Sequence, residues 1–186
     1  MRIGVDIDGV LRDFVGSLLI QYYKDFPNHE VEAITEWDLH NFFPVGKAIY
    51  PYAFNVKAKE VFEDAEPYPG AYVAMIALKE RGHEIIYVTT QPHGKEIHTL
   101  NWLLKHNFPY DGLVITGMKD IANCDVYIDD GPHNIKALQD AGKEVVIYDQ
   151  PWNRLSLGMR AYSLQEFAEI VDGLNTQRSA RTGTQG

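Results

Sequence analysis

From residue 71 onward, short apolar stretches alternate with stretches of helical periodicity. The predicted strands are 2–7, which lies at the N-terminus, and 84–89, 113–115, 125–128 and 144–148. The predicted helices are 71–81, 95–106, 132–141 and 164–172, with another that begins after Asp13 and ends before Pro27. Such alternation favours a parallel sheet covered by helices on both faces. The predicted fold class is therefore α/β, with a doubly wound parallel sheet.

The chain between the first strand and residue 71 lacks this alternation. Its aromatic residues stand among prolines and a glycine, at Trp37, Phe42, Phe43, Tyr50, Tyr52 and Phe54. This composition favours short helices and loops, and Pro67-Tyr68-Pro69-Gly70 predicts a turn back to the sheet. We therefore predict a core of residues 1–14 and 71–172 and an inserted module at 15–70. The polar, aperiodic residues 173–186 are predicted to be a disordered tail.

Several simple features favour a cytoplasmic protein. Cys124 is the sole cysteine, so no intrachain disulfide can form. No stretch approaches the roughly 20 apolar residues that a membrane span needs. The N-terminal sequence MRIGVDIDGV has aspartates where a signal peptide would have its apolar segment. We expect a cytoplasmic location and no membrane partner.

The charge of the chain argues against a nucleic acid polymer as partner. The formal net charge is −9, and no basic cluster occurs before the predicted tail. Proteins that bind a long phosphate backbone usually present a basic surface. An acidic protein can still bind a small phosphate ester if a metal ion and one or two cations lie at the site itself.

Reactive side chains follow the predicted strands at the ends where those strands finish. They are Asp6 and Asp8, Thr89 and Thr90, Lys119 in a loop between strands, and Asp129 and Asp130. In open parallel sheets, ligands bind beyond the carboxyl ends of the strands. We therefore expect these residues to lie close together.

The pair Asp6 and Asp8 fits a division of labour between two carboxylates. Residues two apart on a strand point to the same side, so both can face one site. A cation beside Asp6 would keep it ionised and nucleophilic, while Asp8 could hold a proton for a leaving group. Gly9 would let the backbone turn closely around a phosphate. The alternative is a strand end with two solvated aspartates.

The other polar residues complete the requirements for phosphoryl transfer. Asp129 and Asp130 offer the oxygen ligands that Mg²⁺ prefers, although an acidic turn before Pro132 is the alternative. The hydroxyls of Thr89 and Thr90 and the charge of Lys119 could hold phosphate oxygens. Each signal is weak alone. Together they supply the nucleophile, the acid, the metal ligands and the donors to phosphate oxygens that phosphoryl transfer needs.

The motifs DIDGV, VTT, Lys119 and YIDD resemble the four motifs of the haloacid dehalogenase-like phosphatases. Within that superfamily the chain is most similar to the 5′(3′)-deoxyribonucleotidases, through FEDAEPYPGA at 62–71, TGMK at 116–119, YIDDGP at 127–132 and DQPWNR at 149–154. The resemblance covers about residues 1–172. It implies a Rossmann-like core with a small helical cap, formed by residues 15–70, inserted after the first strand.

The resemblance also implies roles for individual residues. Asp6 would attack phosphorus and form an aspartyl-phosphate, and Asp8 would protonate the leaving nucleoside and then activate water. The Mg²⁺ ligands would be Asp6, the backbone carbonyl of Asp8 and Asp129, with Asp130 supporting them. The phosphate-binding residues would be Thr89, Thr90 and Lys119.

Phe14 and Trp37 match positions where these nucleotidases hold the base, although both could instead be cap core. The chain departs from mammalian members at Glu36, where they have an aromatic residue, and at Gly117, where they have an arginine. These departures leave the base and sugar preference open.

We therefore expect a Mg²⁺-dependent nucleoside monophosphate phosphatase whose partner is a small-molecule nucleotide. A phosphatase for another small phosphoester, such as a sugar phosphate, is one alternative. A non-catalytic phosphate-binding domain on the same fold is a second, although such a domain needs no second carboxylate as acid. The sequence leaves open whether the chain forms a homodimer.

Overall fold

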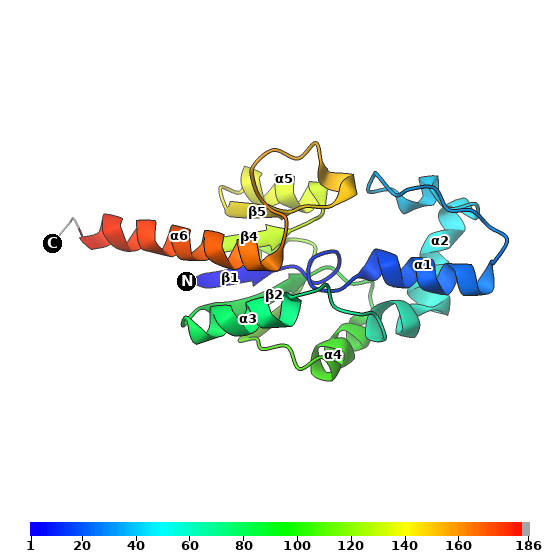
Figure 1. Cartoon of the computed structure of the whole chain (residues 1–186), viewed down its shortest axis with the longest axis horizontal. Coiled ribbons are helices and arrows are strands. Elements are labelled where there is room, and N and C mark those ends of the chain that lie inside the picture. Colours follow the sequence, from blue (N-terminus) through cyan, green and yellow to red (C-terminus); the bar gives the residue numbers. More distant parts are fainter. Residues whose placement is uncertain (184–186) are drawn as a thin grey trace.

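A single parallel sheet forms the centre of the computed structural model, which describes residues 1–183 (Figure 1). Its strands are β1 (Arg2–Val5), β2 (Glu84–Thr89), β3 (Gly112–Ile115), β4 (Val126–Asp129), β5 (Glu144–Tyr148) and β6 (Met159–Ala161). They lie in the order β3-β2-β1-β4-β5-β6, and every pairing is parallel. The predicted α/β class with a doubly wound parallel sheet is confirmed.

Helices cover both faces of this sheet because the strands are apolar on both sides. In β2, Ile85 and Tyr87 face a cluster that contains residues of α3 (Ala71–Glu80), α4 (Glu96–Lys105) and α6 (Leu164–Gly183). The alternate residues Ile86 and Val88 join a cluster with α5 (Pro132–Asp140) and the 3₁₀ turn Lys119–Ala122. Burial on both faces is typical of parallel sheets and explains the near-continuous apolar runs of their strands.

Residues 15–70, here called the inserted segment, have an apolar cluster of their own. The segment holds most of α1 (Phe14–Asp25), the 3₁₀ turns Leu39–Asn41 and Gly46–Ala48, α2 (Ile49–Pro51), and the π-helical turns Tyr52–Val56 and Lys59–Glu63. The buried residues of this cluster are Leu18, Tyr22, Phe43, Ile49, Ala53, Ala58, Val61 and Phe62. Figure 1 shows α1 and α2 at the end of the molecule away from both termini.

The start of α1 follows the capping pattern expected from the sequence. The Asp13 side chain accepts a hydrogen bond from the backbone N–H of Gly16, at 2.9 Å. This bond satisfies one of the N–H groups that the first turn of a helix leaves without a partner.

Two elements near the C-terminus differ from the prediction. Strand β6 was not predicted, because three residues are too few to show an alternating pattern. Helix α6 continues to Gly183, so the disordered tail predicted from residue 173 is wrong for 173–183. Leu174 packs against the core, and Arg178 forms an ion pair with Asp125 at 2.6 Å. The sequence pattern could not reveal that partner, and residues 184–186 lie outside the described part of the chain.

Within residues 1–183, the structure contains no helix that is both long enough and apolar enough to cross a membrane.

Candidate active site

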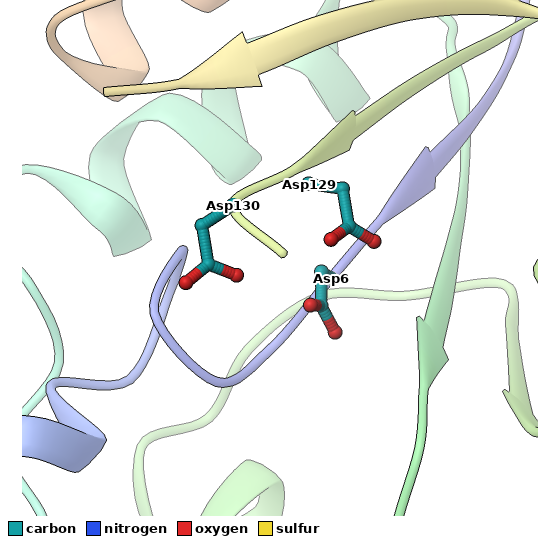
Figure 2. A group of neighbouring side chains, drawn as sticks. All are labelled: Asp6, Asp129 and Asp130. Carbon is teal, nitrogen blue, oxygen red and sulfur yellow. The ribbon is translucent and has the colours of Figure 1, made fainter. Parts of the chain in front are cut away.

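Three aspartates meet where β1 and β4 end. Asp6 follows β1, Asp129 ends β4, and Asp130 comes next. Their carboxylates offer oxygen atoms that all lie within 4.8 Å of one another, and Figure 2 shows them gathered around one space. The order of the strands reverses at β1, and a doubly wound sheet typically binds its ligand at such a point.

These carboxylates are buried, with Asp6 7%, Asp129 1% and Asp130 2% exposed. Burial raises the pKa of Asp6 to about 7, with Lys119 opposing the shift and Asp129 adding to it. Burial, then the charges of Asp6 and Asp129, raise the pKa of Asp130 well above its usual range. The three acids are therefore held together at a cost that a nearby positive charge would offset.

Lys119 supplies part of that positive charge. Its Nζ lies 2.9 Å from Oδ2 of Asp6 and 2.5 Å from Oδ2 of Asp129, and the side chain is almost fully buried. Burial alone would lower the pKa of this amine, but the charges of Asp129 and Asp6 outweigh it and raise that pKa. One amine cannot balance three carboxylates, so ionising all three at once requires further positive charge.

The donor set of the cluster fits a hard divalent cation. Oδ1 of Asp130 is buried and has no hydrogen-bond partner in the described part of the chain. Mg²⁺ prefers carboxylate and carbonyl oxygens in an octahedral arrangement, with water completing its shell. A cation at this point would bind the orphaned oxygen and stabilise the ionised form of the three carboxylates.

Gly9 allows the loop after β1 to approach the cluster closely. Its φ is +80°, and a Cβ at this position would lie 2.0 Å from Oδ2 of Asp130. A side chain would therefore collide with the carboxylate as well as strain the backbone.

Asp8 has different surroundings from the cluster. Its Oδ1 accepts a hydrogen bond from Nε of Arg12 at 2.7 Å, and its Oδ2 accepts one from Nη2 at 3.0 Å. Oδ2 also accepts a bond from Nε2 of Gln91 at 2.8 Å, and the same amide donates to the Thr89 hydroxyl at 3.2 Å. Two aspartates only two residues apart thus lie in contrasting electrostatic environments, with Asp8 beside a guanidinium and Asp6 among carboxylates.

A cavity of about 450 Å³ joins these groups to the inserted segment. Its polar end is lined by Asp6, Asp8, Gly9, Thr89, Thr90, Gln91, Lys119, Asp130 and Asn134. Its aromatic end is lined chiefly by Phe14, Trp37, Leu39, Tyr50, Phe54 and Phe62. The size suits a small molecule with one polar and one flat apolar part.

All the predicted catalytic, metal, phosphate and base residues line this cavity except Asp129, whose carboxylate pairs with Lys119. Thr89 is buried, whereas the Thr90 hydroxyl donates to the carbonyl of Thr116 at 2.9 Å. Trp37 is 45% exposed, and its ring lies 4.8 Å from that of His133 in α5. Trp37 therefore connects the inserted segment to α5, a helix that packs on the sheet.

Several residues at the site were not assigned from the sequence. Besides Arg12 and Gln91, Asn134 donates to Oδ1 of Asp129 at 3.2 Å, and Trp152 donates to Oδ2 of Asp130 at 2.9 Å. Trp152 belongs to the DQPWNR motif, which could have drawn attention to it. The others carry no sequence signal, because their partners lie in distant parts of the chain or beside strand ends.

Comparisons with known proteins agree with this geometry. The model of the family described as "5' nucleotidase, deoxy (Pyrimidine), cytosolic type C protein" matches residues 1–178. A putative 5'(3')-deoxyribonucleotidase of Chlorobaculum tepidum is 28% identical over 184 residues, covering 94% of this chain and 91% of that protein. A putative nucleotidase of Oceanobacillus iheyensis is 30% identical over 191 residues, covering 92% and 95%.

The fold also has counterparts among solved structures. A haloacid dehalogenase-like hydrolase of Streptococcus pneumoniae superposes with a TM-score of 0.61 at 13% identity, covering 91% of this chain and 97% of that one. At this identity the likeness concerns the fold alone.

Proposed function

The chain belongs to the 5′ nucleotidase, deoxy (pyrimidine), cytosolic type C family, and from this membership we propose that it is a Mg²⁺-dependent nucleoside monophosphate phosphatase acting through an aspartyl-phosphate. Family membership makes the chain a phosphoric monoester hydrolase of the 5′-nucleotidase type. The observation that carries the proposal is the cavity, which has buried carboxylates and Lys119 at one end and aromatic side chains at the other.

Asp6 is the proposed nucleophile. Its Oδ1 accepts the N–H of Ile7 at 2.8 Å and its Oδ2 contacts Lys119, so the carboxylate has a defined orientation. The residues that would hold Mg²⁺ are Asp6, the backbone carbonyl of Asp8 and Asp129, with Asp130 in support. When bound, Mg²⁺ supplies positive charge that keeps the nucleophile ionised and offsets charge on the transferring phosphoryl group.

Asp8 is the proposed acid and base. It gives a proton to the leaving nucleoside oxygen as the aspartyl-phosphate forms on Asp6. It then takes a proton from the water that attacks this intermediate. Lys119 and the Thr89 hydroxyl lie beside the same space and can hold the phosphate oxygens, with Thr90 at its rim.

The aromatic end of the cavity is the proposed site for the base. Phe14 and Trp37 would contact a planar base, and the inserted segment would act as a cap that excludes water from the reacting phosphate. A flat, partly polar ring fits this wall better than a sugar, which favours nucleotides over sugar phosphates as substrates.

The test is phosphate release from deoxyribonucleoside and ribonucleoside monophosphates, set beside sugar phosphates, with Mg²⁺ present. We expect nucleoside monophosphates to be hydrolysed with the highest kcat/KM, and Asp6→Asn to abolish the release. A sugar phosphate that outperforms every nucleotide would contradict the substrate class, and an active Asp6→Asn variant would contradict the mechanism.

A further inference from the structure

Arg12 is a fully buried guanidinium beside Asp8. Nε and Nη2 bind the two carboxylate oxygens of Asp8 as a fork, at 2.7 and 3.0 Å. Nη2 also donates to the Thr99 hydroxyl at 3.1 Å, and Nη1 donates to the carbonyl of Phe62 at 2.9 Å. A buried cation is costly unless its donors are paired, and here each nitrogen of the guanidinium has a partner.

The fork leaves the two oxygens of Asp8 in different states. Oδ2 accepts two hydrogen bonds, from Arg12 and from Gln91, which use both of its lone pairs. Oδ1 accepts one, from Nε of Arg12, and its second lone pair has no partner among residues 1–183. Oδ1 is therefore the oxygen of Asp8 that has a lone pair left for a proton.

The same guanidinium also contacts the inserted segment. Its central carbon lies 5.1 Å from the centre of the Phe62 ring and 5.2 Å from that of Trp102. The Phe62 ring in turn lies 5.2 Å from Phe14 and 5.7 Å from Phe54, which line the aromatic end of the cavity. Arg12 thus connects the proposed acid to the wall of the proposed base site.

We propose that Arg12 is a positioning residue for proton transfer, which holds Asp8 with Oδ1 presented to the leaving oxygen. The inference rests on the proposed role of Asp8 as acid. In the first half-reaction the Oδ1 proton moves to the leaving oxygen while its bond to phosphorus breaks and the Asp6–phosphorus bond forms. In the second half, Oδ1 takes a proton from water while the water oxygen bonds to phosphorus, the bond from Asp6 to phosphorus breaks and inorganic phosphate forms. Arg12 keeps its own protons throughout.

The test compares Arg12→Met with wild type on phenyl phosphate and p-nitrophenyl phosphate. The two esters present the same ring, but p-nitrophenolate leaves readily without a proton, whereas phenolate gains more from one. We expect kcat/KM to fall at least about tenfold on phenyl phosphate and much less on p-nitrophenyl phosphate, because proton transfer contributes roughly 10²–10⁴-fold. An equal loss on both esters would mean that Arg12 serves only the fold and would overturn the proposal.

Arg12→Lys keeps the charge and most of the volume, so it provides a test if the methionine variant does not fold. A lysine is a point charge and cannot bind both oxygens of Asp8 as a fork. For Arg12→Lys we expect a smaller loss of kcat/KM than for Arg12→Met, again selective for phenyl phosphate. Arg81→Met is the matched control, since it removes a surface pair with Asp172 and should leave the ratio of the two activities unchanged.

Adding Asp8→Asn separates this inference from the proposed function. If Asp8 is the acid, Asp8→Asn alone loses kcat/KM selectively on phenyl phosphate. Adding Arg12→Met to that variant should then change kcat/KM by less than about threefold, because the effects of residues that act through one another are not additive. An equal loss from Asp8→Asn on both esters would contradict the acid role itself. A selective loss from Asp8→Asn, with full additivity in the double variant, would contradict only the role of Arg12.

Discussion

The polar end of the cavity is built on the sheet, whereas the aromatic end is built on the inserted segment. At the polar end, Asp6 follows β1 and Asp129 ends β4, and the buried Lys119 binds both carboxylates. At the aromatic end, side chains come from α1, from short turns and from loop residues such as Trp37, which is 45% exposed. Under the proposed function, the reacting groups thus lie beside the strands of the sheet, and the groups that select the base lie on the inserted segment, where a substitution disturbs less.

Asp6→Asn is expected to have the largest effect, because it removes the proposed nucleophile. Activity should fall below about 1% of wild type, since losing an essential group usually costs at least ~10² in rate. The fold should persist, because burial already disfavours the charged form of Asp6, whose pKa is raised to about 7. Turnover and thermal melting measure the two effects.

The control for this change is Asp140→Asn, which breaks a surface pair with Lys136 and should leave turnover intact. More than about 1% residual activity in Asp6→Asn would show that the polar end holds a different nucleophile.

Metal removal should be nearly as severe. A chelator should stop phosphate release, and Mg²⁺ should restore it. Mg²⁺ should also raise the melting temperature of the wild type, because a ligand that binds only the folded state stabilises it. Asp129→Asn should lose this thermal shift while Asp140→Asn keeps it. Full activity in excess chelator, or an unchanged shift in Asp129→Asn, would refute the metal site.

Trp37→Ala should weaken nucleotide binding at the aromatic end. Stacking on an aromatic side chain is worth roughly 1–3 kcal/mol per base, so kcat/KM for dUMP and UMP should fall about 5- to 150-fold. The loss on p-nitrophenyl phosphate should be smaller, because a small ester depends less on this wall. Tyr162→Ala changes an exposed aromatic outside the cavity and serves as the control.

Equal losses of Trp37→Ala on all three substrates would mean that Trp37 holds the inserted segment against His133 rather than binding a base. Trp37 would then contribute to the structure of the aromatic end and not to substrate selectivity.

Truncation after Asp172 should have the smallest effect on activity, because α6 lies away from both ends of the cavity. Loss of the Leu174 packing and of the Arg178–Asp125 pair should lower the melting temperature by a few degrees, at about 2–4 °C per kcal/mol for a chain of this size. Arg178→Ala alone should lower it less, since exposed ion pairs contribute about 0–1 kcal/mol. A marked fall in kcat/KM would show that this helix supports the site.

The sequence by itself determined the fold class and most of the polar end. Period-two and helical patterns report which face of each element is apolar, and parallel strands deliver their carboxyl ends to one edge. Asp6, Thr89 and Asp129 could therefore be assigned to a common site without any knowledge of their contacts. Motif resemblance added Phe14 and Trp37, whose binding roles stay predictions.

Only the tertiary structure decided which distant residues meet these groups. Arg12 binds the Phe62 carbonyl fifty positions away and the hydroxyl of Thr99 still further along the chain. Arg178 of α6 pairs with Asp125, which comes directly before β4. No local pattern encodes such pairs, because periodicity describes the face of one element at a time. The partner on the other side is set by how the elements pack.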